Sequence, residues 1–195
     1  MADGRVLFQE FLRAPTRTAT VTASSDALVG ALLAPHRLDG APVVVELGAG
    51  TGRVTDALQR QLRGAGRHLA VEINPALAER LSARHPDVTV VCADAARLPD
   101  VLAEHGIEQA DAIVSLLPWV AYAATPVPAL AARALAPTGT FTQATLRGFH
   151  LLPPARTQAA DLRAAFGSLT ASSTIWRNLP PARVLIAREP RATAS

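Results

Sequence analysis

The stretch Val43-Val44-Val45-Glu46-Leu47-Gly48-Ala49-Gly50-Thr51-Gly52 decides the fold of this 195-residue chain. Its three consecutive valines favour a buried β-strand, and three glycines at alternate positions follow at once. Apolar residues then recur at spacings of three and four from Val54 to Leu62, which predicts a helix. Strand, glycine turn and helix together predict the nucleotide-binding corner of a doubly wound α/β sheet. Glycines suit this turn because its backbone adopts positive φ and approaches a ligand closely.

The spacing of the glycines narrows the choice of ligand. Dinucleotide-binding loops follow the pattern G-x-G-x-x-G. This loop is G-x-G-x-G, and Arg53 stands where the third dinucleotide glycine would fall. The N–H groups at the start of the helix are expected to face a polar ligand. A glycine loop alone also fits an ordinary tight turn, so the prediction needs support from the neighbouring strands.

Two acidic residues lie at the ends of the next two predicted strands. Residues 68–72 predict the second strand, with Glu72 at its tip, where a carboxylate can accept hydrogen bonds from ribose hydroxyls. Residues 88–92 predict the third strand, and Asp94 follows it. Each acid alone also fits a solvated carboxylate or a helix cap. Their succession after the glycine loop favours one shared nucleoside site.

Length and composition favour a single domain and exclude several classes of protein. An apolar content of 49% is ample for the core of a seven-stranded sheet, and no apolar run reaches the roughly 20 residues of a membrane span. The first residues do not form a signal peptide, so a cytoplasmic location is expected. The single cysteine, Cys92, closes what we expect to be a buried strand, and it excludes an intrachain disulfide and a zinc site. No metal is expected.

The remaining pattern predicts further helices and strands. Ser25 is the expected N-cap of one helix, and Asn74 with Pro75 is expected to start another. The expected helices, beyond those that follow Gly52 and Asn74, cover residues 5–14, 26–33, 100–104, 129–136 and 155–166, and the later strands cover residues 112–116, 140–146, 168–176 and 182–188.

With Glu46 two residues before the first glycine, and Glu72 and Asp94 behind it, the pattern resembles the class I, Rossmann-like S-adenosylmethionine-dependent methyltransferases. The resemblance implies a doubly wound, mostly parallel seven-stranded sheet with helices on both faces and an antiparallel last strand. It also implies that the Asp94 carboxylate accepts from the adenine amine and that the Ala95 N–H donates to the ring. The implied cofactor-binding residues are Glu46, Gly48, Ala49, Gly50, Gly52, Glu72, Ile73, Asp94, Ala95 and Ser115.

The loop after the fourth strand, Leu116-Leu117-Pro118-Trp119, stands where amino-methylating members of this class carry a motif. That motif has a polar or small residue, an apolar residue, proline and an aromatic residue. Its backbone carbonyl binds the substrate amine, and its ring packs on the substrate. Leu116 replaces the polar or small residue, so a side-chain acceptor is lost. We expect Leu116, Pro118 and Trp119 at the catalytic position, although a plain proline turn with Trp119 in the core also fits.

Longer segments look like the bacterial phospholipid N-methyltransferases, relatives of the ribosomal RNA adenine dimethyltransferases. This resemblance implies methyl transfer to the amine of a phospholipid such as phosphatidylethanolamine. It also implies a lid over the site formed by residues 1–40, with residues 4–17 touching the inner face of the membrane, and a methyltransferase domain over residues 41–195. The chain departs from the family at Thr22-Ala23 and at Leu116. The segments that carry the resemblance are residues 13–15, 18–25, 45–52, 71–75, 116–119 and 176–182.

Candidates for substrate chemistry lie after the later strands. Tyr122 and His150 are the candidate bases for the amine proton, and His150 has the more suitable ordinary pKa. Arg147 or Arg177 can hold a phosphate with two parallel hydrogen bonds. Trp176 and Asn178 complete the predicted substrate set. Tyr122 also fits a lid residue, and His150, Arg147 and Arg177 also fit a solvated surface.

Other substrates remain open. The alternatives are a soluble small-molecule amine or secondary metabolite, and a non-methylating protein of the same fold. Residues 141–195 carry a net charge of +5, which suits phosphates of lipid or nucleic acid but also a solvated surface. Aromatic residues make up only 4% of the chain, and no segment is long enough for a separate RNA-binding domain, so nucleic acid is disfavoured. The sequence leaves the oligomeric state open.

Overall fold

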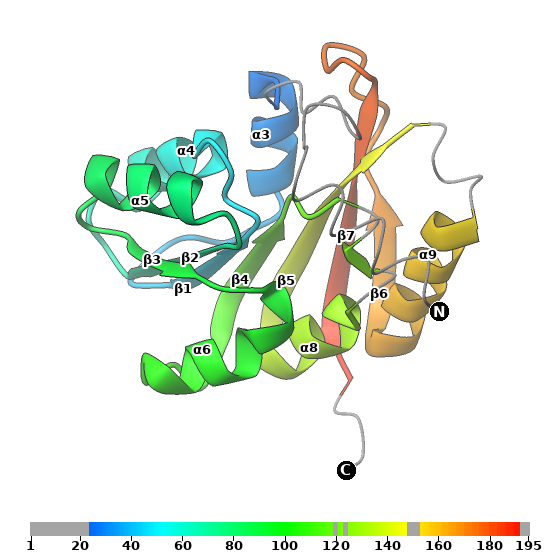
Figure 1. Ribbon diagram of the computed structural model, residues 1–195. Coiled ribbons are helices and arrows are strands. Elements are labelled where there is room, and N and C mark those ends of the chain that lie inside the picture. The colour runs from blue at the N-terminus through cyan, green and yellow to red at the C-terminus, as the bar shows by residue number, and fades with distance from the viewer. Residues whose placement is uncertain (1–23, 119–120, 123–124, 148–152, 192–195) are drawn as a thin grey trace.

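The computed structural model describes residues 24–118, 121–122, 125–147 and 153–191. Within this part the strands form one seven-stranded sheet in the order β3-β2-β1-β4-β5-β7-β6 (Figure 1). Neighbouring strands from β3 to β5 are parallel, whereas β7 runs antiparallel to both β5 and β6. The predicted Rossmann-like, mostly parallel sheet with an antiparallel last strand is therefore confirmed. The expected helix over residues 5–14 lies outside the described residues, and the division of the chain at residue 40 stays a prediction.

Helices cover both faces of the sheet. Helices α3, α4 and α5 lie on one face and α6, α8 and α9 on the other (Figure 1). The strands are β1 Val43–Leu47, β2 Arg67–Glu72, β3 Thr89–Cys92, β4 Ala110–Ser115, β5 Leu135–Leu146, β6 Phe166–Ala171 and β7 Ala182–Pro190. The helices are α3 Asp26–Leu33, α4 Arg53–Leu62, α5 Pro75–Arg84, the 3₁₀ turn η1 Ala95–Arg97, α6 Leu98–Glu104, α8 Val127–Ala134 and α9 Pro153–Ala165.

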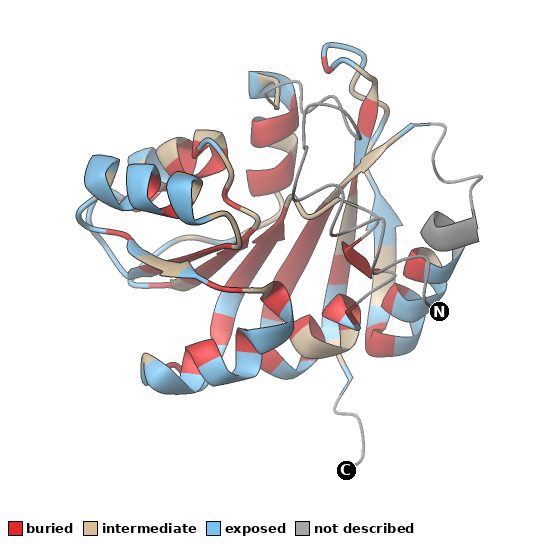
Figure 2. Cartoon of the chain, viewed as in Figure 1, coloured by how far each residue is buried: buried red, intermediate tan, exposed pale blue. Residues whose placement is uncertain are grey.

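The helices on both faces of the sheet explain why β1 contains a run of valines. Val44 packs into the cluster beneath α3 and α4, whereas Val45 packs into the larger cluster beneath α6 and α8. Because successive side chains of a strand point to opposite faces, a central strand covered on both sides needs apolar residues at every position. Figure 2 shows the central strands as a continuous buried layer between exposed outer helix faces.

Side-chain caps fix the starts of two helices. The Ser25 hydroxyl accepts from the N–H of Leu28 at 3.2 Å. The Asn74 carboxamide oxygen accepts from the N–H groups of Ala76 and Leu77, and Pro75 occupies the first position of α5. Both predicted N-caps are confirmed, and each such cap stabilises a protein by about 1 kcal/mol.

Among the sequence predictions that were wrong, two concern boundaries and one concerns burial, and each has an identifiable reason. Helix α8 ends at Ala134 rather than at residue 136, because Leu135 already pairs with Ala110 before a bulge in β5. The sixth strand ends at Ala171, because residues 172–181 form its connection to β7. Cys92 is exposed and does not end a buried strand as expected, because β3 is the edge strand of the described sheet and pairs there only with β2.

Within the described ranges, no group of three or more His, Cys, Asp or Glu side chains is placed to hold a metal ion. None of the helices in that same part of the chain is long and apolar enough to cross a membrane.

His36 makes stability dependent on pH. Its Nε2 lies 2.8 Å from the Thr142 hydroxyl, and burial together with the nearby Arg188 lowers the pKa of His36 to about 4. An unfolded histidine titrates near pH 6.5, so the full stabilisation is present above that pH and is lost as the pH falls toward 4. We expect the free energy of unfolding in urea to drop by about 2 kcal/mol from this group between pH 7 and pH 5. His36→Gln should show a flatter pH dependence, and parallel curves for the two proteins would contradict this assignment.

Candidate active site

The glycine turn is bonded to the tip of β2. Gly48, Gly50 and Gly52 all have positive φ, at 77°, 55° and 83°. The Gly48 N–H donates to the Val71 carbonyl at 2.8 Å, and the Gly50 N–H donates to Glu72 Oε2 at 2.7 Å. The N–H of Gly50 is therefore used inside the chain rather than kept free for a ligand.

Glu72 connects three segments at this edge of the sheet. Its Oε1 accepts from the Asn74 N–H at 2.8 Å, while its Oε2 holds Gly50, so the carboxylate joins β2, the glycine turn and the start of α5. A carboxylate has about four acceptor positions, so two hydrogen bonds leave room for two more. Glu72 is buried, and these two hydrogen bonds hold its carboxylate in place.

An apolar pocket opens beside Glu72 at the carboxyl ends of β1 to β4. It is narrow, about 20 Å³, which is room for about one water molecule. Leu117 contributes to this narrowness, because a methyl group built on Gly48 would lie only 3.1 Å from Leu117 Cδ2. The lining residues are Gly48, Val71, Ile73, Ala93, Asp94, Ala95, Leu117, Ala121, Thr125 and Val127.

Asp94 lies at the wall of this pocket and also caps a helical turn. Its Oδ1 accepts from the Ala96 N–H at 2.8 Å, which starts η1. The helix-cap interpretation and the ligand interpretation of this acid are therefore compatible, because a capping carboxylate keeps a second oxygen for other donors.

Glu46 lies behind the glycine turn, outside the residues that line the pocket. It is fully buried, and its Oε2 accepts from the Thr55 hydroxyl of α4 at 2.7 Å and lies 3.2 Å from His68 Nε2. His68 is held in turn by Gln59, whose Nε2 lies 2.9 Å from His68 Nδ1. These contacts anchor the start of α4 to β1 and β2. The structure gives Glu46 this internal role, and its predicted contact with a cofactor stays a prediction.

The third glycine of the loop is needed for packing of α5. A Cβ at Gly52 would come within 2.5 Å of Leu81 Cδ1 and would collide with the Arg84 guanidinium. Arg84 is fixed there because it donates to the Thr51 carbonyl at 2.9 Å and lies 3.3 Å from Asp56.

Gly52→Ala is expected to lower the free energy of unfolding by about 2–4 kcal/mol, because positive φ costs about 1–3 kcal/mol and the clash adds to it. Denaturant unfolding measures this change. Gly30→Ala is the matched control, since Gly30 lies inside α3 with no heavy atom within 4 Å of an added Cβ. That control should be neutral or stabilising by up to about 1 kcal/mol. Equal effects at the two positions would contradict the packing argument.

Ser115 and Tyr122 form a buried polar pair beside the loop that follows β4. The two hydroxyls lie 3.1 Å apart, and the Ser115 hydroxyl also accepts from the Leu117 N–H at 3.4 Å. Burial raises the pKa of Tyr122 well above its usual value, and hydrogen bonds to Ser115 and Gln158 offset this only in part. Tyr122 therefore keeps its proton at neutral pH, which disfavours it as a general base there.

Gln143 of β5 is a polar residue at this site that the sequence analysis did not single out. It is buried, it pairs in register with Ser115, and its Nε2 donates to the Leu117 carbonyl at 3.0 Å and to the Ala144 carbonyl at 2.6 Å. Two carbonyls around one end of the carboxamide fix its orientation, because only the NH₂ group can donate to both. Gln143 Oε1 is buried and has no hydrogen-bond partner among the described residues.

The loop residues and candidate bases are only partly described. Leu116 is partly buried and packs against the cluster beneath α3 and α4, and its N–H donates to the Leu47 carbonyl at 3.0 Å. The carbonyl of Pro118 accepts from the Ala121 N–H at 2.9 Å. Trp119 and His150 lie outside the described residues, so their predicted roles stay predictions.

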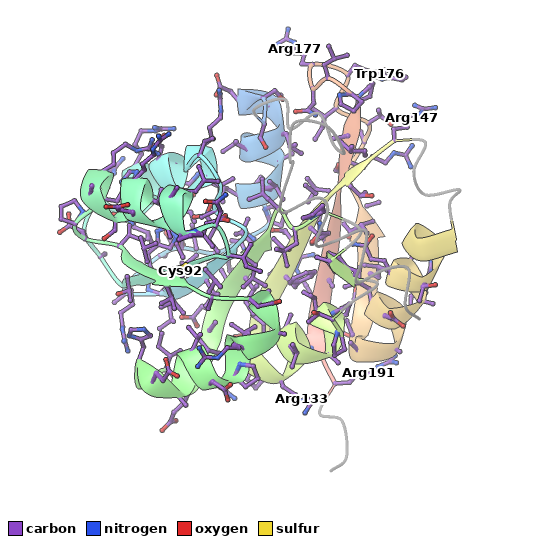
Figure 3. All side chains as sticks on the ribbon, viewed as in Figure 1. Cys92, Arg133, Arg147, Trp176, Arg177 and Arg191 are labelled. Carbon is purple, nitrogen blue, oxygen red and sulfur yellow. The ribbon has the colours of Figure 1, made fainter. Side chains whose placement is uncertain are left out.

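Three of the predicted substrate residues lie together beyond the carboxyl ends of the strands (Figure 3). The Arg147 guanidinium carbon lies 4.7 Å from the centre of the Trp176 ring, and Arg177 follows Trp176 in the exposed connection between β6 and β7. Asn178 differs from them because it is buried and bonded within the chain. Its Oδ1 accepts from the Ser25 N–H at 3.0 Å, and its Nδ2 donates to the Pro180 carbonyl at 2.8 Å.

Known proteins share this fold. The structure is similar to precorrin-6y C5,15-methyltransferase from Geobacter metallireducens GS-15, with a TM-score of 0.66 and 16% identity, covering 88% of this chain and 92% of that one. It is also similar to human methyltransferase-like protein 13 in complex with SAH, with a TM-score of 0.62 and 20% identity, covering 84% and 82% of the two chains. The fold is that of the class I S-adenosylmethionine-dependent methyltransferases.

Sequence comparison narrows the relationship. Over 151 residues the chain is 32% identical to ornithine lipid N-methyltransferase of Singulisphaera acidiphila, covering 74% of this chain and 79% of that protein. The chain therefore belongs to the methyltransferase family of that lipid-modifying protein. A family model for the TrkA-N domain also matches residues 49–145, just under half of the chain. The predicted class is confirmed, while the finer resemblance to phospholipid N-methyltransferases and ribosomal RNA dimethyltransferases stays a prediction.

Proposed function

We propose that this protein transfers a methyl group from S-adenosylmethionine to the amine of a lipid. The observation that carries the proposal is the Glu72 carboxylate at the tip of β2, beside an apolar pocket and bonded to the glycine turn. Strand tips next to such a turn are where open α/β sheets bind their ligands. The family relationship to an ornithine lipid N-methyltransferase supports the class of acceptor.

The residues present fit an adenosyl group. The two remaining acceptor positions of Glu72 suit the ribose hydroxyls. Ile73 and Ala95 supply apolar walls for the adenine, and the free oxygen of Asp94 suits its exocyclic amine. The Leu117 side chain, which packs against Gly48 and the core, has to move to make room for the adenosyl group.

The cofactor supplies a methyl group already activated by a sulfonium, so the protein has mainly to hold a neutral amine in line with it. The Leu117 carbonyl, oriented by Gln143, would accept one amine N–H, and Gln143 Oε1 is free to accept a second. This arrangement supplies from β5 the side-chain acceptor that Leu116 lacks. Tyr122 keeps its own proton, so the amine proton passes to water or to the predicted base His150.

Transfer of a labelled methyl group tests the proposal. The protein is incubated with labelled S-adenosylmethionine and vesicles containing phosphatidylethanolamine or ornithine lipid, with free ethanolamine and free ornithine as soluble comparisons. We expect label in one of the lipids. Label only in a soluble amine would support the small-molecule alternative. Binding of the cofactor without transfer to any of these amines would support a non-methylating protein.

A further inference from the structure

The connection between β6 and β7, residues 172–181, is here called the hairpin tip. Strands β5 and β6 both run antiparallel to β7, so β6 points in the same direction as β5. The chain therefore leaves β6 on the side of the sheet where the carboxyl ends of β1 to β5 lie. The hairpin tip extends beyond these carboxyl ends, above the rest of the sheet in Figure 1. It therefore lies on the side of the molecule where the candidate active site opens.

Two large apolar side chains are exposed on the hairpin tip. Trp176 is 68% exposed and Leu179 is 73% exposed, and no other large hydrophobic residue in the described part of the chain is exposed. Soluble proteins commonly expose such residues singly. Their concentration within four residues of one projecting turn indicates a surface that is covered in use.

Positive charge surrounds these two side chains. Arg177 lies between them in the sequence, the Arg147 guanidinium stacks over the Trp176 ring, and Arg183 donates to the Thr174 hydroxyl at 3.0 Å. The hairpin tip itself contains no acidic residue. Figure 3 shows Arg147, Trp176 and Arg177 at one end of the molecule and Arg133 and Arg191 at the opposite end.

Hydrogen bonds hold the hairpin tip in this orientation. Asn178 ties it to the start of α3 through the Ser25 N–H, and the Arg147 N–H donates to the Pro181 carbonyl at 2.7 Å. Ile175 also forms a β-bridge with Ala182. Trp176 and Leu179 are therefore carried by a turn whose conformation is held by these contacts, which lowers the conformational entropy lost when the two side chains are buried.

We propose that the hairpin tip docks the protein on an anionic lipid bilayer, with Trp176 and Leu179 in the interfacial layer and Arg147 and Arg177 against lipid phosphates. Tryptophan prefers the membrane interface, where its ring is buried and its N–H stays near water. Guanidinium groups pair with phosphate oxygens through two hydrogen bonds. This surface is separate from the predicted contact through residues 4–17. Docking through this surface does not require the bilayer to contain the lipid that accepts the methyl group.

Co-sedimentation with vesicles tests the docking. The vesicles contain phosphatidylcholine and phosphatidylglycerol, which offer no amine for methylation, and no cofactor is added. Loss of both apolar side chains in Trp176→Ala/Leu179→Ala is expected to weaken binding by roughly tenfold or more. Arg147→Gln/Arg177→Gln is expected to weaken it by roughly tenfold on anionic vesicles and to change little on pure phosphatidylcholine.

Two matched variants control the experiment. Arg133→Gln removes an exposed arginine from α8 at the opposite end and should bind like the unchanged protein. Trp176→Phe/Leu179→Ile should retain most binding, because it keeps most of the apolar area, and thermal unfolding verifies that each variant is folded. Unchanged binding of the alanine variant would overturn the proposal, as would failure of the unchanged protein to bind these vesicles. Because methyl transfer plays no part in the assay, its outcome is independent of the proposed function.

Discussion

Glu72→Gln is expected to weaken S-adenosylmethionine binding by about a hundredfold. The carboxylate accepts from Gly50 and Asn74 inside the chain and, in the proposed complex, from two ribose hydroxyls. Hydrogen bonds to charged groups contribute about 1.5–3 kcal/mol each, so weakening the pair to ribose suffices for this change. The new NH₂ group would also face one of the two backbone donors, which pushes the glycine turn out of place.

Calorimetric titration with the cofactor measures this effect. Glu79→Gln is the matched control, because it makes the same change of charge at an exposed position on α5. We expect the control to leave the dissociation constant unchanged. Denaturant unfolding of both variants separates a loss of binding from a loss of fold. If Glu72→Gln folds and binds the cofactor normally, the ribose does not lie at the tip of β2.

Gln143→Met is expected to lower kcat for methyl transfer by about a hundredfold while leaving the affinity for the cofactor nearly unchanged. Gln143 orients the Leu117 carbonyl and carries the free buried acceptor beside it, and it does not line the cofactor pocket. Displacement of a positioning group by about 1 Å can cost a hundredfold in rate. Methionine keeps the length of the side chain and removes both polar ends.

Comparing the change in kcat with the change in cofactor affinity distinguishes a positioning role of Gln143 from a purely structural one. Calorimetry with the cofactor and initial rates with the lipid amine are measured on the same preparation. Gln61→Met makes the same substitution at an exposed position of α4 and should change neither quantity. A loss of cofactor affinity equal to the loss of rate would show that Gln143 supports the whole site. An unchanged rate would remove it from the reaction.

Local signals accounted for much of the fold. The spacing of apolar residues and the cap at Ser25 placed α3 at its observed bounds, because a helix start depends on residues within one turn. The bulge in β5 and the early end of β6 escaped prediction because they depend on pairing between distant strands. The exposure of Cys92 depends on the position of β3 at the sheet edge, which no local pattern contains.

The positions of some residues at the candidate site could also be predicted from the sequence, and those of others could not. Glu72 ends β2 and Asp94 follows β3 after one residue, so their place at the strand tips could be expected from their order along the chain. Gln143 could not, because its contact with Leu117 spans 26 residues and requires β5 to lie beside β4. Asn178 belongs to residues 176–182, one of the segments that carry the family resemblance, yet its side chain bonds the hairpin tip to the start of α3.

The position of β7 between β5 and β6 has a consequence for the order of folding. Among the described strands, β6 is hydrogen-bonded only to β7, although β6 comes first in the chain. During synthesis β6 therefore has no partner until the ribosome has released β7, and its apolar residues stay available to other chains in that interval. Such late, non-local pairing slows folding and exposes a chain to aggregation. The arrangement places the most vulnerable stage of biogenesis at the completion of the last strand.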